Sequence, residues 1–399
     1  MGATVCAAFI DSKGQRSSAA TAYLTDDVLQ RPNLSVAVGC RVERVLFDND
    51  TNGTTPRAVG VELRIAKDAP LFRVSARKEV ILSAGAYGTP HLLLVSGVGP
   101  RKELEDKIIH VVKDLPAVGK NLVDHPSTGG IVFRATANAP TNDYLTRPLQ
   151  ALLALAQWFT TGGGPMAVLG SPGAIFVRSD DTSLPFGEAP MLDSIVDVTS
   201  GPNSPDLEFV WIPLVIVDGG RGKAPPGVRG VTMSAICLRP QSSGEITLKT
   251  NDIWDKPIID PKWFTNENDM RVLIRGMRLL FKIARTEPLV SHTDLQENYE
   301  YPFLWPGSAN PDTITDEELK GYIRKNFSPA WHPACTARMG KSEDSSVVNS
   351  KLQVHGIKSL RIVDASIFPN QLSGHPCAPI IAISEKASDI IKVEYSATL

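Results

Sequence analysis

Three segments of the chain carry apolar residues in a helical pattern. From Met270 to Ala284 the apolar residues recur every three or four positions, which places them on one helical face. Isoleucines and alanines repeat in the same way between residues 379 and 392. Thr315 and Glu318 have the spacing of a capping box ahead of further apolar residues. The sequence therefore predicts three helices, each with one buried face.

Shorter segments rich in Val, Ile and Phe predict β-strands. In the first 126 residues the strands are predicted at 34–38, 42–47, 59–65, 72–76, 78–82 and 110–112. From residue 127 to about 310, strands separated by loops rich in Pro and Gly are predicted at 130–134, 207–217, 230–238 and 244–249. Because this middle segment lacks a regular alternation of strands and helices, it predicts an antiparallel sheet with helices on one side.

The segment 78–97 predicts a buried strand, a glycine turn and a helix. Thr89 and Pro90 have the residue types of an N-cap and a first helical position, and Gly97 marks the end of the helix. Backbone N–H groups at such a turn can bind the phosphates of a dinucleotide. An ordinary α/β turn has the same pattern, so this segment alone leaves both interpretations open.

Three other segments have helical character. The small residues of 14–24 predict a helix packed closely against a neighbouring element, and residues 102–106 predict a short helix. Residues 149–159 form the most apolar helical segment. This segment is too short to span a bilayer.

Length and charge limit the classes of function. The 399 residues suffice for two domains, and 42% hydrophobic with 21% charged residues is the composition of a soluble globular protein. A net charge of −2 gives no attraction to nucleic acid or acidic lipid. The first residues, from Met1 to Val5, lack the basic and apolar regions of a signal peptide.

The cysteines and the asparagine triplets give little information about metal sites, disulfides or cellular compartment. The five cysteines lack CxxC spacing, so we expect neither a zinc site nor a disulfide framework. Their positions are Cys6, Cys40, Cys237, Cys335 and Cys377. Triplets of the N-glycosylation type, which also occur by chance, begin at Asn33, Asn49, Asn52 and Asn326.

Two histidines are the candidates for acid–base chemistry, because imidazole titrates near neutral pH. His332 follows an aromatic residue, Trp331, which we interpret as a wall of a substrate pocket. His375 stands ahead of the helix predicted at 379–392. The alternative for each histidine is a hydrogen-bonded structural role. The sequence has no GxSxG elbow for a serine hydrolase, and no third metal ligand is evident beside the two histidines.

Several motifs, in order along nearly the whole chain, resemble those of the glucose–methanol–choline (GMC) flavin oxidoreductases. Residues 82–99 resemble the second signature of this family, and residues 115–126 resemble the following segment, with Ala117 where glycine is usual. Residues 239–244 look like the opening of the family's C-terminal region. His332 matches the family's His-Pro-x-Gly-Thr motif, with Cys335 in place of glycine, and residues 363–369 with His375 match the final motif.

The resemblance implies a fold class of α/β plus α+β. It implies an FAD-binding domain with an incomplete Rossmann-like part and a substrate domain built on an antiparallel sheet. The implied boundaries are residues 1–126 for the partial FAD-binding domain, 127–325 for the substrate-binding domain and 326–399 for the return to the FAD-binding domain. The histidine pair and the aromatic residue before His332 look most like the aryl-alcohol oxidase members of the family.

The resemblance also implies roles for individual residues. His332 would be the base that takes the proton of an alcohol while hydride moves to flavin N5, and His375 would hydrogen-bond the alcohol oxygen. The residues implied to contact FAD are Val42, through its backbone to adenine, and Ser83, Ala84, Gly85, Asp364, Ala365 and Pro376. The helix after Pro379 would direct its positive end toward the flavin and stabilise the anionic reduced form. Trp331 favours an aryl or allylic primary alcohol, with O2 or another electron acceptor.

The chain departs from the family in one respect. The Gly-x-Gly-x-x-Gly turn between a strand and a helix is not found, and the glycines at 162–164 follow a predicted helix and precede a proline. The chain begins at what resembles the family's middle region.

Three hypotheses follow from this departure. The chain is the C-terminal portion of a GMC oxidoreductase, from a truncated gene model, a split gene or a processed chain, so that a separate N-terminal chain is a possible partner. Alternatively, it is a short FAD-free paralogue that uses the histidines for acid–base cyclisation or dehydration. In the third hypothesis it is a non-catalytic protein that binds another chain through an open sheet edge. We take the first as the working hypothesis.

Overall fold

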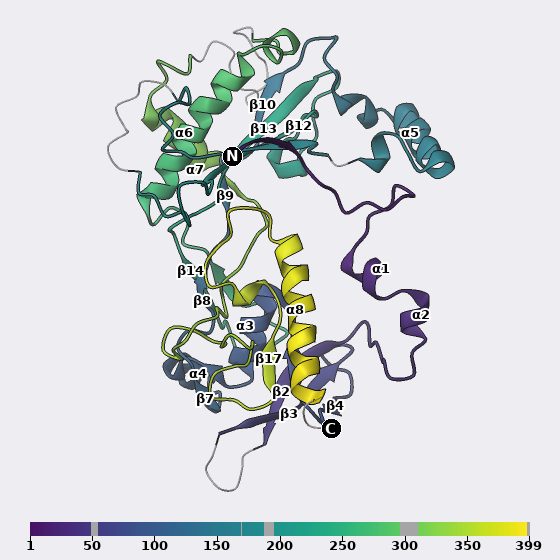
Figure 1. Ribbon diagram of the computed structural model, residues 1–399, viewed down its shortest axis with the longest axis vertical. Helices are drawn as coiled ribbons and strands as arrows, with labels where there is room; N and C mark the ends of the chain where they lie inside the picture. Colours follow the sequence, from purple (N-terminus) through teal and green to yellow (C-terminus); the bar gives the residue numbers. More distant parts are fainter. Residues whose placement is uncertain (49–54, 169, 187–194, 296–309, 397–399) are drawn as a thin grey trace. The chain divides into compact units, whose positions relative to one another are not determined.

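The computed structural model describes residues 1–48, 55–168, 170–186, 195–295 and 310–396 (Figure 1). The glycosylation triplets at Asn49 and Asn52 lie outside these ranges. The chain divides into two compact units. Unit 1 comprises Met1–Leu34, His125–Arg239 and Asn266–Ala330, and unit 2 comprises Ser35–Asp124, Pro240–Thr265 and Trp331–Leu399.

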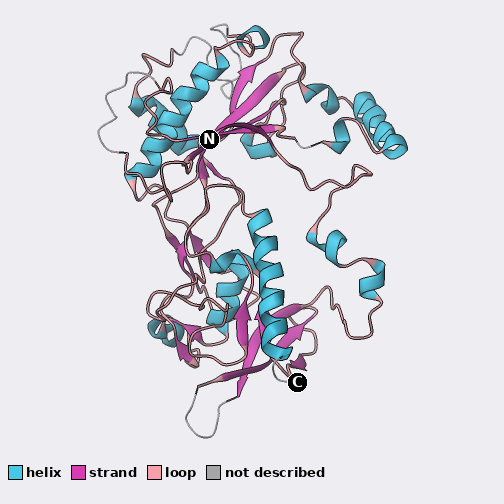
Figure 2. Cartoon of the chain, viewed as in Figure 1, coloured by secondary structure: helices cyan, strands magenta, loops and turns pink. Residues whose placement is uncertain are grey.

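Unit 1 contains an antiparallel sheet, as its sequence predicts (Figure 2). Among the described residues the strand order is β1-β11-β12-β13-β9-β16, and β10 also pairs with β13. The strands are β1 (Gly2–Val5), β9 (Pro126–Ser127), β10 (Ile131–Arg134), β11 (Gly173–Val177), β12 (Leu207–Ile212), β13 (Gly230–Cys237) and β16 (Ser328–Pro329).

The helices of unit 1 differ in how much of their surface is buried. They are α1 (Ala19–Tyr23), α2 (Asp26–Leu29), α5 (Pro148–Thr161), α6 (Glu267–Ala284) and α7 (Asp316–Asn326), with 3-10 turns η1 (Asn142–Thr146), η2 (Pro165–Ala167), η4 (Asp218–Gly220) and η5 (Val290–His292). The predicted helices α6 and α7 are present, and α7 begins with the capping box of Thr315 and Glu318. Gly276 of α6 faces the sheet, and a Cβ there would lie 2.8 Å from the Cβ of Ala235 on β13. Glycine therefore permits this helix to approach the sheet closely.

The expectation that residues 14–24 form a closely packed helix was wrong. The helix is shorter, Ala19–Tyr23, and none of its residues is buried. Its small side chains lie on a short, exposed helix that has Ser18 as its N-cap. No helix among the described residues is long and apolar enough to cross a membrane.

Unit 2 combines parallel and antiparallel strands around one apolar core. Strands β5 (Val80–Leu82) and β17 (Leu360–Ile362) pair in parallel. The antiparallel groups are β2 (Arg41–Asp48), β3 (Arg57–Arg64) and β4 (Phe72–Ser75), and β8 (Lys120–Leu122), β14 (Gly244–Thr247) and β15 (Ile258–Asp260). A further parallel pair joins β6 (Val98–Gly99) and β7 (Lys113–Asp114).

Two helices flank the parallel strands of unit 2. α3 (Gly85–Val95) follows β5 and is buried from Thr89 onward, whereas α8 (Cys377–Ser396) buries only Ala387 and packs Ile380 and Ile383 against the core. The other elements are α4 (Arg101–Asp106) and η6 (Ala365–Ile367). The combination confirms the α/β plus α+β fold class.

Three local predictions in unit 2 were wrong. Residues 34–38 form no strand: Val36 and Val38 are exposed there, and β-propensity without a pairing partner does not make a strand. The strand predicted at 110–112 is instead β7, at Lys113–Asp114. Helix α3 begins at Gly85 rather than at Thr89, because the Thr89 side chain bonds to Asp364 and to the Ala84 N–H instead of capping a helix.

Candidate active site

The backbone of His332 is held from two sides. Its N–H donates to Asp124 Oδ1 at 2.8 Å, and its carbonyl accepts from Gln371 Nε2 at 2.7 Å. Two residues later, Ala334 forms an antiparallel bridge with Val123. Trp331 and Cys335 adopt positive φ angles of 64° and 73°, so the chain turns sharply on both sides of the histidine. These contacts fix the position of His332 through its main chain.

The structure brings the two predicted catalytic histidines together. The ring centroids of His332 and His375 are 4.8 Å apart, and their planes are inclined by 50°. Burial, and then the positive charge of His375, lower the pKa of His332 to about 4. His332 is therefore neutral at neutral pH, and a neutral imidazole has one nitrogen able to accept a proton.

The N-terminus of α8 follows this histidine pair directly. His375 is two residues ahead of Cys377, the first residue of the helix, and the Pro376 carbonyl accepts the first helical bond, from Ile380 N–H at 2.9 Å. Helix α8 has 20 residues, so its N-terminus carries the partial positive charge of a full helix dipole. This end of α8 favours negative charge close to the histidines.

Asp364 connects the end of β17 to the turn between β5 and α3. Its Oδ2 accepts from Gly85 N–H at 3.0 Å and from Thr89 Oγ1 at 2.6 Å. Its Oδ1 accepts from the N–H and the hydroxyl of Ser366. The carboxylate is buried, so its bonds hold the turn in place while the Ala84 and Ser83 side of that turn stays exposed.

The histidine segment is bonded to the same turn. Cys335 N–H donates to the Ala365 carbonyl at 3.2 Å, and Thr336 Oγ1 donates to the Ala86 carbonyl at 2.6 Å. The residues expected to act on a substrate and those expected to bind a cofactor are thus joined within unit 2, although residues 86 and 336 are 250 positions apart in the sequence.

The turn at Gly85 is open at the surface of unit 2. Gly85 has a φ of +78°, and a Cβ at this residue would meet no atom within 4 Å. Ser83 and Ala84 are exposed at the start of α3. An open turn at the amino end of a helix, after a parallel strand, is where phosphate groups bind backbone N–H donors. The open surface of this turn therefore fits contact with FAD, whereas the N–H groups of Ala84 and Gly85 are already bonded to Thr89 and Asp364.

Val42 lies elsewhere in unit 2, on β2. It pairs with Leu63, and a register shift follows it, so that Glu43 is an additional residue in the strand. Val45, three residues along, donates its N–H to Ser96 Oγ at the carboxyl end of α3. An 11-residue helix is about 16 Å long. β2 lies at the carboxyl end of α3, and the Gly85 turn lies at its amino end. Only an extended ligand could contact both.

Trp331 is 82% exposed, next to the histidine that is half-buried. The positive φ of Trp331 is unusual for a bulky residue. The structure thus leaves this ring at the surface of unit 2.

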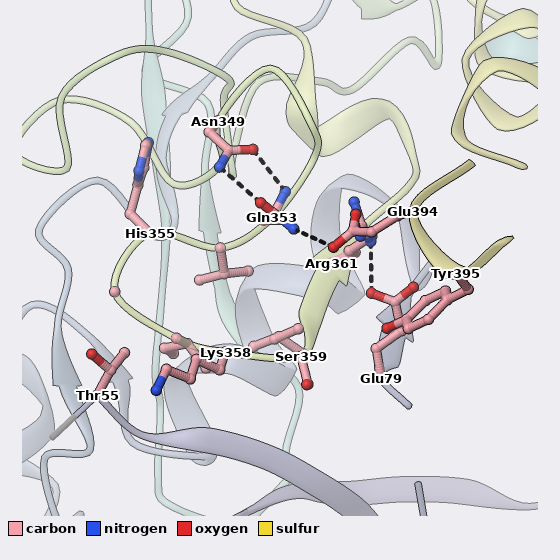
Figure 3. Close-up of a pocket in the computed structure, with 14 residues that line it drawn as sticks. Thr55, Glu79, Asn349, Gln353, His355, Lys358, Ser359, Arg361, Glu394 and Tyr395 are labelled. Carbon is pink, nitrogen blue, oxygen red and sulfur yellow. Dashed lines mark hydrogen bonds and ion pairs between the residues drawn. The ribbon is translucent and has the colours of Figure 1, made fainter. Parts of the chain in front are cut away.

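A polar cavity of about 440 Å³ lies at the other end of the parallel strands (Figure 3). Arg361, in the middle of β17, is almost fully buried and pairs there with Glu79 and with Glu394 of α8. Glu79 precedes β5, whereas the Gly85 turn follows it. Ligands of parallel α/β sheets bind at the carboxyl ends of the strands. The cavity lies at the opposite end, so it is not where a cofactor is expected.

Sequence reasoning missed several of these residues. Arg361 had a signal, because a charge inside the apolar run from Leu360 to Val363 requires a buried partner. Asp124 and Gln371, which hydrogen-bond the backbone of His332, had no comparable signal in the sequence. Both are distant from His332 along the chain, and neither contact involves a side chain of the histidine motif.

Comparison with known families gives two matches. Sequence profiles described as GMC oxidoreductase match residues 2–127 and residues 240–384. A protein named dehydrogenase str4 from Strobilurus tenacellus is 43% identical over 386 residues, covering 95% of this chain and 62% of that protein. Mitochondrial choline dehydrogenase of Mus musculus is 35% identical over 383 residues, covering 95% of this chain and 57% of that enzyme.

Solved structures with the same fold cover all or nearly all of the chain. A crystal structure of formate oxidase has a TM-score of 0.85 at 26% identity and covers 100% of this chain and 66% of that one. A fungal aryl-alcohol oxidase has a TM-score of 0.74 at 29% identity, covering 96% of this chain and 65% of that one. The chain spans about three fifths of the length of the curated relatives it matches.

Proposed function

Because this chain belongs to the GMC oxidoreductase family, whose members bind FAD, we propose that it carries the catalytic residues of an FAD-dependent oxidoreductase acting on alcohols. The name of its relative choline dehydrogenase supports an alcohol as the substrate. The likeness to an aryl-alcohol oxidase supports oxidation at a primary carbinol. The observation that carries the proposal is the contact between His332 and His375 beside the N-terminus of α8.

His332 is the proposed base. Its imidazole is neutral at neutral pH, because burial and His375 lower its pKa to about 4, so it can accept the hydroxyl proton of an alcohol. FAD, when bound, supplies the acceptor for the hydride of the carbinol carbon. With the proton on His332 and the hydride removed, the alcohol leaves as an aldehyde.

His375 is the proposed positioning partner. It is more exposed than His332 and lies 4.8 Å from it between ring centroids, so one alcohol oxygen placed between the rings can contact both. The electrostatic interaction with His375 adds to burial in disfavouring the protonated form of His332.

The cofactor would be held by the turn and by the first residues of α8. Ser83, Ala84 and Gly85 would line the pyrophosphate at the amino end of α3 through the open surface of the turn, since the N–H groups of Ala84 and Gly85 already donate to Thr89 and Asp364. Ala365 and Asp364 would border the ribityl chain, with the Asp364 carboxylate acting through the turn it holds. Val42 would contact the adenine through its backbone, and Pro376 would lie next to the flavin.

Trp331 is proposed as one wall of the alcohol pocket. It precedes His332 directly and presents an exposed aromatic surface. Aromatic stacking would favour an aryl or allylic primary alcohol over a saturated one. O2 or another electron acceptor would then reoxidise the flavin.

The test is to load the purified protein with FAD and to add alcohols without oxygen. Bleaching of the visible flavin absorbance by benzyl alcohol, faster than by a saturated alcohol of equal length, is the expected result. Stoichiometric FAD binding with no bleaching by any primary alcohol would contradict the alcohol assignment. A secondary readout, independent of turnover, is quenching of flavin fluorescence on binding.

A separate polypeptide that completes the FAD-binding unit is supported by β5. Among the described residues this strand pairs only with β17. Val80 and Leu82 bond to that neighbour, so the N–H and carbonyl of Ile81 point to the opposite edge. Ile81 is 44% exposed there, although parallel strands are normally covered on both sides.

The same FAD titration can test for this partner. Co-expression with the N-terminal two fifths of the Strobilurus tenacellus relative should raise FAD affinity if that segment supplies the neighbouring strand of β5. Equal FAD affinity with and without the segment would remove the need for a partner.

A further inference from the structure

Gln371 joins the loop that carries His375 to the backbone of His332. Its Nε2 donates to the His332 carbonyl at 2.7 Å, and its Oε1 accepts from the Leu372 N–H at 3.0 Å. A flipped amide would place oxygen against the carbonyl and nitrogen against the N–H, so the two bonds fix which way the amide faces. Gln371 is 4% exposed, which keeps water from competing for either bond.

The loop itself has little else buried. Between residues 369 and 375, all of which the structure describes, Gln371 alone is buried, and the segment forms no helix or strand. Segments with few buried side chains open easily. Beyond His375 the chain enters α8, where the Pro376 carbonyl accepts the first helical bond. The position of His375 is therefore set by the start of α8 on one side and by Gln371 on the other.

The backbone of His332 also depends on contacts from its surroundings. Trp331, directly before it, has a φ of 64°, and Cys335 has a φ of 73°. A backbone in this sparsely populated region persists where the surrounding structure over-determines it. Trp331 is 82% exposed, so its side chain packs too little to do this. The bonds from Asp124 and Gln371, on either side of His332, supply the contacts.

One side chain thus acts on both histidines, whose ring centroids are 4.8 Å apart. We propose that Gln371 is a positioning residue, which sets the spacing of the His332 and His375 rings by tying the loop of His375 to the backbone of His332. The purpose of this spacing, contact of both rings with one alcohol oxygen, rests on the proposed function. The spacing itself requires neither FAD nor alcohol and can be measured without them.

The pKa of His332 reports the spacing of the rings. Burial, and then the electrostatic interaction with His375, lower this pKa to about 4. Gln371→Met keeps the approximate length of the side chain and removes the amide. The rings should then separate, and the pKa of His332 should rise toward its ordinary value of 6.5. NMR titration of protein with labelled histidine rings measures the change, and the signal lost in His332→Gln identifies the residue.

A double-mutant cycle separates positioning from packing. In the His375→Ala background no second ring remains to be positioned, so adding Gln371→Met should leave the pKa of His332 where His375→Ala alone puts it. If Gln371 only excludes water from His332, the substitution should raise the pKa equally in both backgrounds. Equal rises would overturn the proposal, and so would an unchanged pKa in Gln371→Met itself.

Gln353→Met is the matched control. Gln353 is a partly buried glutamine of unit 2 whose amide bonds to Asn349 and Glu394, at the cavity shown in Figure 3. Its loss should leave the pKa of His332 at the wild-type value. If Gln371→Met does not fold, as judged by circular dichroism, Gln371→Asn replaces it. Asparagine keeps an amide one methylene shorter, which moves the donor away from the His332 carbonyl and should also raise the pKa.

Flavin reduction by an alcohol then tests what the spacing is for. In the FAD-loaded protein Gln371→Met should lower the rate about 10–100-fold, the cost of a small misplacement of reacting groups, without weakening FAD binding. A wild-type rate in this variant would overturn the claim that the spacing serves the reaction. A wild-type protein that no alcohol reduces, with the pKa cycle as predicted, would contradict the proposed function and support the positioning of the rings by Gln371.

Discussion

The imidazole rings of His332 and His375 lie with their centroids 4.8 Å apart, although 42 residues separate the two histidines along the chain. The segment between them supplies β17 and Asp364, which bonds to the turn at Gly85. The fold thus joins the proposed proton acceptor and the proposed cofactor turn within one unit. This relationship underlies the first predictions.

Replacing His375 should raise the pKa of His332. Burial and the charge of His375 together lower that pKa to about 4, and His375→Ala removes the second cause. The pKa should therefore move from about 4 toward the ordinary value of 6.5, and it should stop short of that value because burial remains. NMR titration of the histidine ring protons measures the change. An unchanged titration would show that the rings are not coupled in solution.

The lowered pKa of His332 also predicts a dependence of stability on pH. The unfolded chain protonates this residue near pH 6.5, whereas the folded chain resists protonation until about pH 4, so stability is lost as the pH falls through this window. We expect a loss of roughly 1–2 kcal/mol, reduced for the part of His332 that solvent screens. The measurement is urea unfolding at pH 7 and pH 4.5 for the wild-type protein and for His332→Gln.

The difference between the two proteins isolates His332 from the other groups that titrate in this range. His332→Gln should lose less stability than the wild-type protein between the two pH values. Equal losses would mean that His332 is not buried as the structure has it.

Asp364→Asn should weaken both the fold and cofactor binding. The substitution places amide hydrogens against donors from Gly85 and Thr89 and leaves them unsatisfied. We expect a decrease of about 2–4 kcal/mol in the free energy of unfolding, and at least tenfold weaker FAD binding. Asp106→Asn, an exposed carboxylate at the end of α4, is the control and should change stability by less than about 0.5 kcal/mol.

The two readouts for Asp364 separate its roles. Weaker FAD binding at a temperature where the variant is fully folded supports the role in holding the turn. Unchanged stability and unchanged FAD binding would refute the assignment of Asp364 as the residue that fixes the turn.

Arg361→Met should destabilise unit 2. It removes a buried guanidinium and leaves Glu79, whose side chain is 6% exposed, without its partner. Removing one member of a buried ion pair costs about 3–5 kcal/mol. Chemical denaturation measures the loss. The double variant Arg361→Met with Glu79→Gln should recover part of it, and a double variant no more stable than Arg361→Met would contradict the pairing.

Local patterns predicted the helices of this chain well and the strands less well. The capping box at Thr315 and the apolar face from Met270 to Ala284 are determined by neighbouring residues, and both helices form. Residues 34–38 have strand-forming side chains and yet form no strand, because pairing depends on a partner that local sequence does not reveal. Thr89 was misread for the same reason, since its hydroxyl bonds to Asp364, 275 residues away.

The motif residues of the candidate site could be predicted from the sequence, but the residues that hold them in position could not. His332, His375 and the Gly85 turn stand in motifs that a reader of the sequence can recognise. Asp124 and Gln371, which hydrogen-bond the backbone of His332, stand in no recognisable pattern with it in the sequence. Only the folded structure brings them close to His332.

The most direct test of the central claim is the rate of flavin reduction by an alcohol in the FAD-loaded protein, measured by anaerobic stopped-flow absorbance. His332→Ala should lower this rate by about 10²–10⁴-fold, the contribution of a positioned base. His110→Ala, an exposed histidine of unit 2, is the matched control and should leave the rate unchanged. A His332→Ala protein that binds FAD and is reduced at the wild-type rate would contradict the assignment of His332 as the base.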